Sequence, residues 1–214
     1  MTRFPSFRYR VLLKDKDLAG VSRGEKYISD NLKGKMKKKR MTKYAYDTTT
    51  SRVVGLTDES ANWGKQFGKA DMVIEAVFED LSLKHKVIQQ LEEHLPPHAV
   101  FASNTSAIPI ARIAEASQRP ENVIGMHYFS PVPQMPLLEI IPHKGTSKEA
   151  AAAAFEVGKK QGKTVIFVKD VPGFYVNRCL GPYLVETGAL MEGALVASLG
   201  IGCLAWLLSP RLKI

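Results

Sequence analysis

The sequence has few cysteines and no secretory signal. Only two of its 214 residues are cysteine, Cys179 and Cys203, and neither lies in a CxxC or a cysteine–histidine spacing. This argues against a disulfide scaffold and against a zinc site, so we expect a reducing compartment and no metal. The N-terminal sequence MTRFPSFRYR lacks the apolar core of a secretory signal and is compatible with the end of an organelle-targeting segment.

Long hydrophobic runs are also scarce. The longest uncharged one is residues 193–208 (GALVASLGIGCLAWLL), which the basic sequence SPRLK follows. Its 16 residues fall just short of the length of roughly 20 that a helix needs to cross a bilayer. We therefore leave open both a buried helix and an association with a membrane.

The excess of basic over acidic residues is concentrated in a single segment. The chain has 30 Lys and Arg against 21 Asp and Glu, and residues 33–43 (KGKMKKKRMTK) hold seven of the basic residues and no acidic one. Such a patch predicts a polyanionic partner, which is a nucleic acid, a membrane surface or a small ligand with several phosphates. Nucleic acid is the least favoured, because the run has no recognition motif and no interleaved aromatic residues.

What the chain does have is the composition of a globular protein, 45% hydrophobic and 24% charged, and alternating strand and helix patterns. Apolar runs predict strands at 9–14, 72–76, 100–102, 123–126, 137–141 and 165–168. Several of these runs lack polar alternation, and continuous Val, Ile and Leu indicate strands buried on both faces, as in a parallel sheet. Helical patterns span 81–95 and Ser147 to about Lys160, the second opened by a capping box from Thr146 to Glu149 and closed near Gly162. The order predicts an α/β fold, a doubly wound, mostly parallel sheet with right-handed crossovers.

In such a sheet ligands bind at the carboxyl ends of the strands. Asp15 follows the first run, and in a dinucleotide-binding fold an acid at the end of the second strand accepts hydrogen bonds from the ribose hydroxyls, which favours NAD over NADP. An ordinary turn aspartate is the simpler interpretation of this residue taken alone. The segment from Ser103 to Ser106 follows the third run, and His127 ends the fourth.

Glu139 has the most unusual placement, inside the apolar run LLEII. A buried carboxylate is costly unless a cation or hydrogen-bond donors answer it, and His127 is the nearest candidate. Together they would form a general base able to take a proton from an alcohol. His127 alone would be interpreted as a core histidine, but Ser106 and Asn104 also lie at strand ends, and Asn177 could add an amide donor.

Four segments between residues 69 and 186 carry a family resemblance. They are KADMVIEAVFEDLSLKHKV, FASNTSAIPI, VIGMHYFSPVPQMPLLEII and VKDVPGFYVNRCLGPYLVE. They resemble the L-3-hydroxyacyl-CoA dehydrogenase family, and especially the trifunctional alpha subunits of mitochondrial fatty-acid β-oxidation. The resemblance implies a Rossmann-like fold, a mitochondrial location, oligomeric relatives and NAD-dependent oxidation of an L-3-hydroxyacyl-CoA to the 3-oxoacyl-CoA without a metal.

The resemblance also implies roles for particular residues. His127 would be the catalytic base and Glu139 its partner, while Ser106 and Asn177 would hydrogen-bond the substrate oxygen. Lys38 would contact a phosphate of coenzyme A, which makes acyl-CoA rather than nucleic acid the expected partner. Cofactor contacts would fall on Asp15, Ala76, Glu79, Lys84, Ser106 and Ser130, and at the last of these many relatives carry Asn.

The sequence departs from the family in two places. It has no G-x-G-x-x-G after a first strand, so we expect the first strand and its glycine-rich loop to be missing. After Glu186 it turns into apolar sequence instead of an all-helical domain. We therefore expect a partial NAD-binding domain over 1–170 and the start of a helical domain over 171–214. The alternative to a dehydrogenase is a truncated, non-catalytic fragment that binds acyl-CoA or a partner, and associates with a membrane through its tail.

Overall fold

The structure is a computed structural model that describes residues 9–61 and 63–192. The first eight residues of the expected targeting segment, the apolar run 193–208 and Cys203 lie outside the described residues. Within the described part, no helix combines the length and the apolar character needed to cross a membrane.

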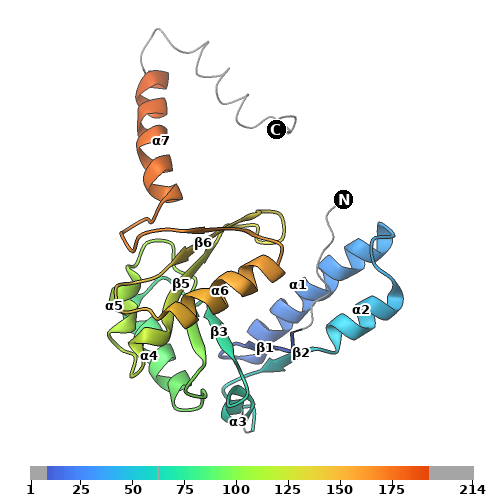
Figure 1. Cartoon of the computed structure of the whole chain (residues 1–214). Helices are drawn as coiled ribbons and strands as arrows, with labels where there is room; N and C mark the ends of the chain where they lie inside the picture. Colours follow the sequence, from blue (N-terminus) through green and yellow to red (C-terminus); the bar gives the residue numbers. More distant parts are fainter. Residues whose placement is uncertain (1–8, 62, 193–214) are drawn as a thin grey trace.

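Strands and helices alternate along the described chain, as expected (Figure 1). The strands are β1 (Val11–Lys14), β2 (Val53–Leu56), β3 (Met72–Glu75), β4 (Val100–Ser103), β5 (Val123–Tyr128), β6 (Leu137–Ile141) and β7 (Thr164–Phe167). The helices are α1 (Leu18–Lys37), α2 (Lys43–Thr50), α3 (Trp63–Phe67), α4 (Leu81–Glu92), α5 (Ile110–Ala114), α6 (Lys148–Lys160) and α7 (Val176–Glu192), with a short 3-10 turn at Pro120–Asn122.

Each of the apolar runs expected to form strands does so, and β6 has the expected bounds. Sequence reasoning missed β2, because a four-residue run that contains Gly55 gives a weak strand pattern. The expected capping box of α6 is wrong. Its N-cap is Ser147, which accepts a hydrogen bond from the Ala150 N–H, while the Thr146 hydroxyl donates to the Val123 carbonyl instead.

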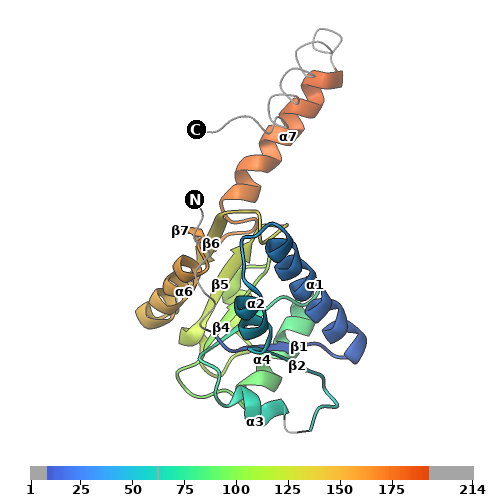
Figure 2. The same ribbon diagram turned by 90° about the vertical axis from the view of Figure 1, so that its right-hand side faces the viewer.

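The strands form two separate ladders (Figure 2). The larger has the order β3-β4-β5-β6-β7, in which β3, β4 and β5 are parallel, β6 is antiparallel to β5, and β7 is parallel to β6. β1 and β2 form a parallel pair of their own. Among the described residues β1 pairs with β2 alone and β3 with β4 alone, so hydrogen bonding is interrupted between β1 and β3. In the strand order 3-2-1-4-5-6 of dinucleotide-binding sheets, the first strand lies at this position.

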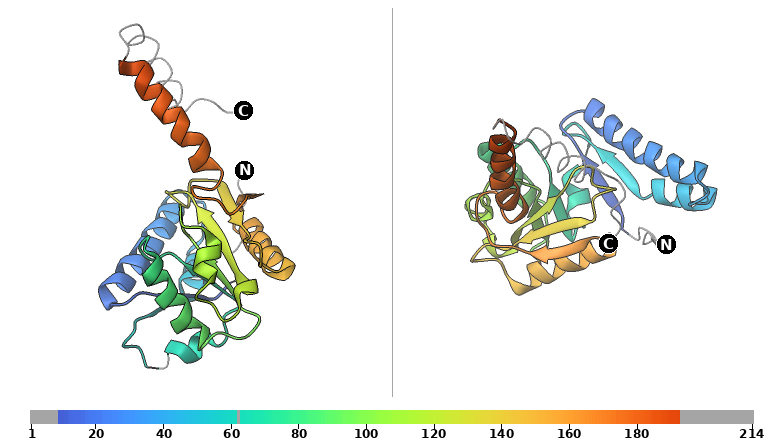
Figure 3. Two further views of the ribbon diagram at one scale, coloured as in Figure 1. Left: turned by 90° about the vertical axis from the view of Figure 1, so that its left-hand side faces the viewer. Right: turned by 90° about the horizontal axis from the view of Figure 1, so that it is seen from above.

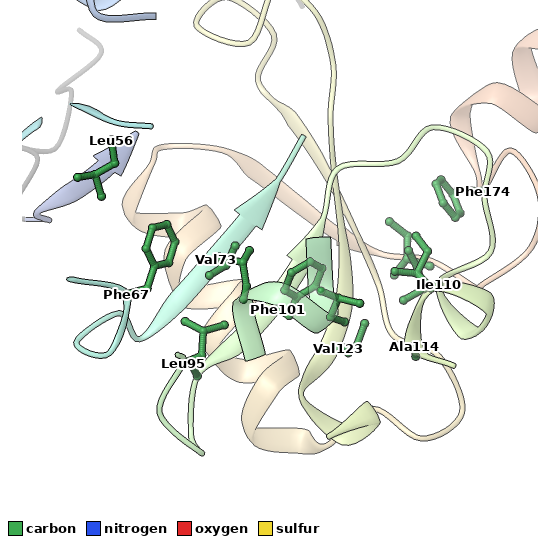
Figure 4. Close-up of a cluster of buried hydrophobic side chains, with 14 residues drawn as sticks. Leu56, Phe67, Val73, Leu95, Phe101, Ile110, Ala114, Val123 and Phe174 are labelled. Carbon is green, nitrogen blue, oxygen red and sulfur yellow. The ribbon is translucent and has the colours of Figure 1, made fainter. Parts of the chain in front are cut away.

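The larger sheet is covered on both faces, which explains its uninterrupted apolar runs. Figure 3, seen from above, shows α6 on one face and α4 and α5 on the other. Alternate residues of a strand therefore enter different cores: Phe101 packs with Ile88 of α4 and Ile110 of α5, whereas Ala102 packs with Ala154 of α6. Figure 4 shows that the first of these cores runs from Leu56 of β2 to Phe174, just before α7.

A pair of glycine substitutions tests this packing. A Cβ on Gly125 of β5 would lie 2.7 Å from Ile110 Cδ1 and 2.9 Å from Ile141 Cβ, so Gly125→Ala is expected to cost about 1–3 kcal/mol through overpacking. A Cβ on Gly34 of α1 would meet no atom within 4 Å, so Gly34→Ala should be neutral or stabilise the helix by up to about 1 kcal/mol. Urea unfolding measures both free energies, and equal effects would contradict the close approach of α5 to β5.

Candidate active site at the carboxyl ends of the strands

His127 and Glu139 face each other across the antiparallel pair β5–β6, in which they are direct register partners. The distance from His127 Nδ1 to Glu139 Oε2 is 2.7 Å. The Glu139 side chain is fully buried, and the His127 side chain is 8% exposed. The expected pairing of these two residues is thus present in the structure.

The second oxygen of Glu139 binds the start of α7. Oε1 accepts hydrogen bonds from the backbone N–H groups of Tyr175 at 3.2 Å and Val176 at 2.9 Å. The buried carboxylate therefore has donors on both oxygens, which offsets the cost of removing it from water.

Aromatic rings enclose the His127 imidazole. The ring centroid of Phe129 lies 4.5 Å from that of His127, and the ring of the buried Phe174 lies 5.7 Å away. Among the described residues, His127 Nε2 has no hydrogen-bond partner, whereas Nδ1 is held by Glu139. With the Nδ1 proton donated to the carboxylate, Nε2 carries the lone pair and is the nitrogen available to take a proton.

Next to this pair lies a buried ionic network at the ends of β3 and β4. The ammonium group of Lys84, whose side chain is fully buried, lies 2.9 and 3.1 Å from the two carboxylate oxygens of Glu75 and 3.5 Å from Glu79. The Ser103 hydroxyl donates to Glu75 at 2.7 Å. Lys84 is thus engaged inside the protein, and its expected contact with the cofactor stays a prediction.

Glu79 links this network to the loop after β4. One of its oxygens accepts hydrogen bonds from the Thr105 hydroxyl at 2.5 Å, the Ser106 N–H at 2.9 Å and the Ala107 N–H at 3.2 Å. Partial burial raises the pKa of Glu79, but these donors and the Lys84 charge outweigh it, so the pKa lies below its ordinary value. Glu79 is therefore an ionised anchor that holds the loop.

The structure joins most of the expected site residues. Asn177 Nδ2 donates to the Ser106 carbonyl oxygen at 3.2 Å, so α7 meets the loop that Glu79 holds. Hydrogen bonds and ion pairs thus connect Lys84, Glu79, Ser106, Asn177, Glu139 and His127, the last two through the start of α7.

Among the described residues, no hydrogen bond or ion pair joins the other expected residues to this group. Ala76 and Ser130 are exposed, directly after β3 and shortly after β5. Asp15 follows β1, where its backbone N–H donates to the Leu56 carbonyl and its carboxylate accepts a hydrogen bond from the Lys16 N–H. Lys38 caps the carboxyl end of α1 and is exposed. The roles expected of these residues stay predictions.

Sequence reasoning missed Glu75 and Phe174, and it noted Ser103 only as the start of the segment after the third run. Glu75 had a signal, because it lies in the apolar run MVIEA just as Glu139 lies in LLEII. A charge inside a buried strand needs partners, so the same argument applied to both. Phe174 gave no comparable signal, since its burial beside His127 depends on a turn that is far from His127 in the sequence.

The family model for the NAD-binding domain of 3-hydroxyacyl-CoA dehydrogenase matches residues 2–171. A curated relative, the fatty acid oxidation complex subunit alpha of Vibrio vulnificus (strain CMCP6), is 45% identical over 181 residues, which are 85% of this chain and 25% of the relative. The chain therefore spans about a quarter of that relative's length.

Solved structures agree with this match. FadB2 of M. tuberculosis has a TM-score of 0.85 at 30% identity, over 96% of this chain and 72% of that one. The 3-hydroxybutyryl-CoA dehydrogenase of Escherichia coli K12 has a TM-score of 0.81 at 32% identity, over 88% of this chain and 39% of that one.

Removing the buried cation tests the ionic network. Lys84→Met leaves the Glu75 carboxylate without its counter-charge and should lower the free energy of unfolding by about 3–5 kcal/mol in urea denaturation. The double substitution Lys84→Met with Glu75→Gln removes both charges and should recover much of that loss. A double variant as unstable as Lys84→Met would show that the uncompensated charge is not the cause.

The pH dependence of stability tests the role of ionised Glu79 in holding the loop after β4. Since the folded-state pKa of Glu79 lies below its ordinary value of 4.5, ionised Glu79 stabilises the fold above that value, and the contribution is lost as the pH falls through the folded-state pKa. Glu79→Gln should therefore be less stable than the wild type near neutral pH, with a gap that closes on acidification. Glu156→Gln, on the exposed side of α6, is the control and should leave stability unchanged. A gap that is independent of pH would contradict the assignment.

Proposed function

Because this chain belongs to the 3-hydroxyacyl-CoA dehydrogenase family and contains its NAD-binding domain, we propose that it catalyses the oxidation of an L-3-hydroxyacyl-CoA to the 3-oxoacyl-CoA in fatty-acid oxidation. The main support is the His127–Glu139 pair, in which a carboxylate with no exposed surface is hydrogen-bonded at 2.7 Å to an imidazole whose Nε2 has no partner among the described residues. This arrangement suits a base that acts on an alcohol.

In this proposal His127 Nε2 takes the proton of the substrate hydroxyl while hydride leaves carbon 3. The imidazolium that results is stabilised by Glu139, which also keeps the proton on Nδ1 and so fixes the tautomer. Bound NAD supplies the acceptor for the hydride. The rings of Phe129 and Phe174 limit the access of water to the base.

Ser106 and Asn177 orient the substrate oxygen in this proposal. The Asn177 amide has two N–H donors and gives one to the Ser106 carbonyl, so its second donor is a group for the substrate. The Ser106 hydroxyl donates to Glu79 at 3.4 Å, and its oxygen keeps lone pairs that can accept a hydrogen bond from the substrate hydroxyl. Their mutual hydrogen bond supports this role, because it holds the strand-end loop and α7 in one arrangement.

The residues present suit the ribose and the nicotinamide of NAD better than its pyrophosphate. A Cβ on Gly20 would lie 2.2 Å from Asp15 Oδ2, so a glycine is what lets the Asp15 carboxylate rest against the start of α1, where a ribose hydroxyl would bind it. Ala76 and Ser130 supply exposed positions at the strand ends for the nicotinamide side. A glycine-rich cradle for the pyrophosphate does not occur in this sequence.

The basic segment is proposed to meet the phosphates of coenzyme A. Lys33, Lys37 and Lys38 are exposed near the carboxyl end of α1, whereas Lys43 is paired with Asp47. Lysines act as point charges toward phosphate groups, which supports Lys38 as a contact.

Two finer expectations stay predictions. One is the mitochondrial location, since the curated relative described above is bacterial. The other is assembly, for which the description of that relative as a complex subunit is the support. The alternative function, a non-catalytic fragment that binds acyl-CoA or a partner, is favoured by one observation, the interruption of the sheet between β1 and β3.

Calorimetry with NAD separates the two functions. We expect NAD to bind the purified chain, and His127→Gln to abolish turnover of an L-3-hydroxyacyl-CoA while NAD affinity stays nearly unchanged, because the base acts on the substrate rather than on the cofactor. His98→Gln, an exposed histidine bonded to Asp71, is the matched control and should keep full activity. No heat of binding at roughly millimolar NAD would leave the non-catalytic fragment as the function of this polypeptide, and a fully active His127→Gln would remove the assignment of the base.

A further inference from the structure

Residues 171–176, which form the turn after β7 and the first residue of α7, contact the His127–Glu139 pair. We call this turn the elbow. It contains two successive residues in the left-handed region, Gly173 with a φ of 76° and Phe174 with a φ of 49°. A side chain disfavours that conformation, so a phenylalanine adopts it only where its surroundings hold it there. Here the Phe174 ring is 1% exposed and packs in the core that Figure 4 shows, beside Ile110.

This conformation brings the start of α7 onto Glu139. The first N–H groups of a helix have no partner within the helix, and a carboxylate is favourable there because of the helix dipole. In most helices the capping group comes from the adjacent sequence. In α7 it is Glu139, from β6, which accepts the Tyr175 and Val176 N–H groups at 3.2 and 2.9 Å.

The same carboxylate holds the base. Because the two oxygens of a carboxylate are rigidly linked, fixing Oε1 on the elbow also fixes the direction in which Oε2 meets His127 Nδ1 at 2.7 Å. The Phe174 ring adds a direct contact, with its centroid 5.7 Å from that of the imidazole. The tautomer of a histidine is set by the hydrogen bond of its other nitrogen, so the elbow acts on Nε2 through Glu139.

Beyond the elbow, α7 leaves the body of the protein (Figures 1 and 3). Its side chains Leu180, Tyr183, Leu184 and Val185 are exposed. Its hydrogen bonds to the sheet region are those of the elbow and the bond from Asn177 to Ser106, among the residues that the structure describes. The orientation of α7 is therefore set at the point where it meets Glu139, the partner of the candidate base.

We propose that the elbow is a positioning element for His127. Phe174 anchors it in the core, the N–H groups of Tyr175 and Val176 fix the Glu139 carboxylate, and the carboxylate fixes the tautomer and orientation of the imidazole. The catalytic consequence rests on the proposed function, since it requires His127 to be the base. The geometric coupling does not, because it concerns only the residues of this chain.

A proline substitution tests the coupling. Val176 is the first residue of α7, a position where proline is well tolerated, so Val176→Pro removes one donor to Glu139 without breaking the helix. Val176→Thr keeps the N–H and nearly the same shape, and is the matched control. The readout is the His127 Nδ1 proton, which a hydrogen bond to a carboxylate moves far downfield in NMR spectra of the full chain. We expect Val176→Pro to shift or lose this resonance and Val176→Thr to keep it. Where the chain turns over substrate, kcat should fall roughly 10-fold or more with an unchanged KM for NAD.

A second variant covers a failure of Val176→Pro to fold, as judged by circular dichroism. Phe174→Gly removes the anchor while it tolerates the left-handed φ, and should also shift or lose the resonance. Phe101→Leu removes a ring from the same core away from the elbow, and should keep it. The proposal is overturned if the folded elbow variants retain the wild-type resonance, or if Phe101→Leu changes it as much as Phe174→Gly. Since NMR needs no NAD, absent NAD binding removes the proposed function alone, and an unchanged resonance removes this proposal alone.

Discussion

The buried carboxylate of Glu139 is the constraint on which the candidate site depends. A charge with no exposed surface is tolerated only where donors surround it, and its donors come from β5 and from the start of α7. One residue of β6 therefore holds Nδ1 of His127 and also caps the start of α7. Truncating Glu139 would remove more than a partner of the base, because α7 would lose the cap on its first turn.

The same principle organises the neighbouring strand ends. Glu75 is the second buried acid, and it is answered by Lys84 and Ser103. Through Lys84 and Glu79 this network reaches the loop of Ser106, and through Ser106 it reaches Asn177. Two ionic groups that are expensive to bury thus fix the loops at one edge of the sheet, which is where a doubly wound fold places its ligand.

The first described elements of the chain, β1, α1 and β2, lie outside this network of buried charges. β1, α1 and β2 carry Asp15 and the basic segment, but their ladder is separate from the larger sheet. Under the proposed function, the acid after β1 would serve the nucleotide cofactor and the lysines at the end of α1 would serve coenzyme A. The match covers residues 2–171, so it includes this part as well as the larger sheet.

By itself the sequence determined the α/β class, every strand of the larger sheet, and the pairing of His127 with Glu139, because apolar periodicity and the cost of burying a charge are both legible in the order of residues. It did not reveal β2, whose four residues carry too little pattern. Only the tertiary structure decided that Lys84 points inward to Glu75, that Ser147 rather than Thr146 caps α6, and that the N–H groups of α7 complete Glu139. The physical reason is that a hydrogen bond depends on distances of a few tenths of an ångström between groups far apart in the chain, and folding alone sets those distances.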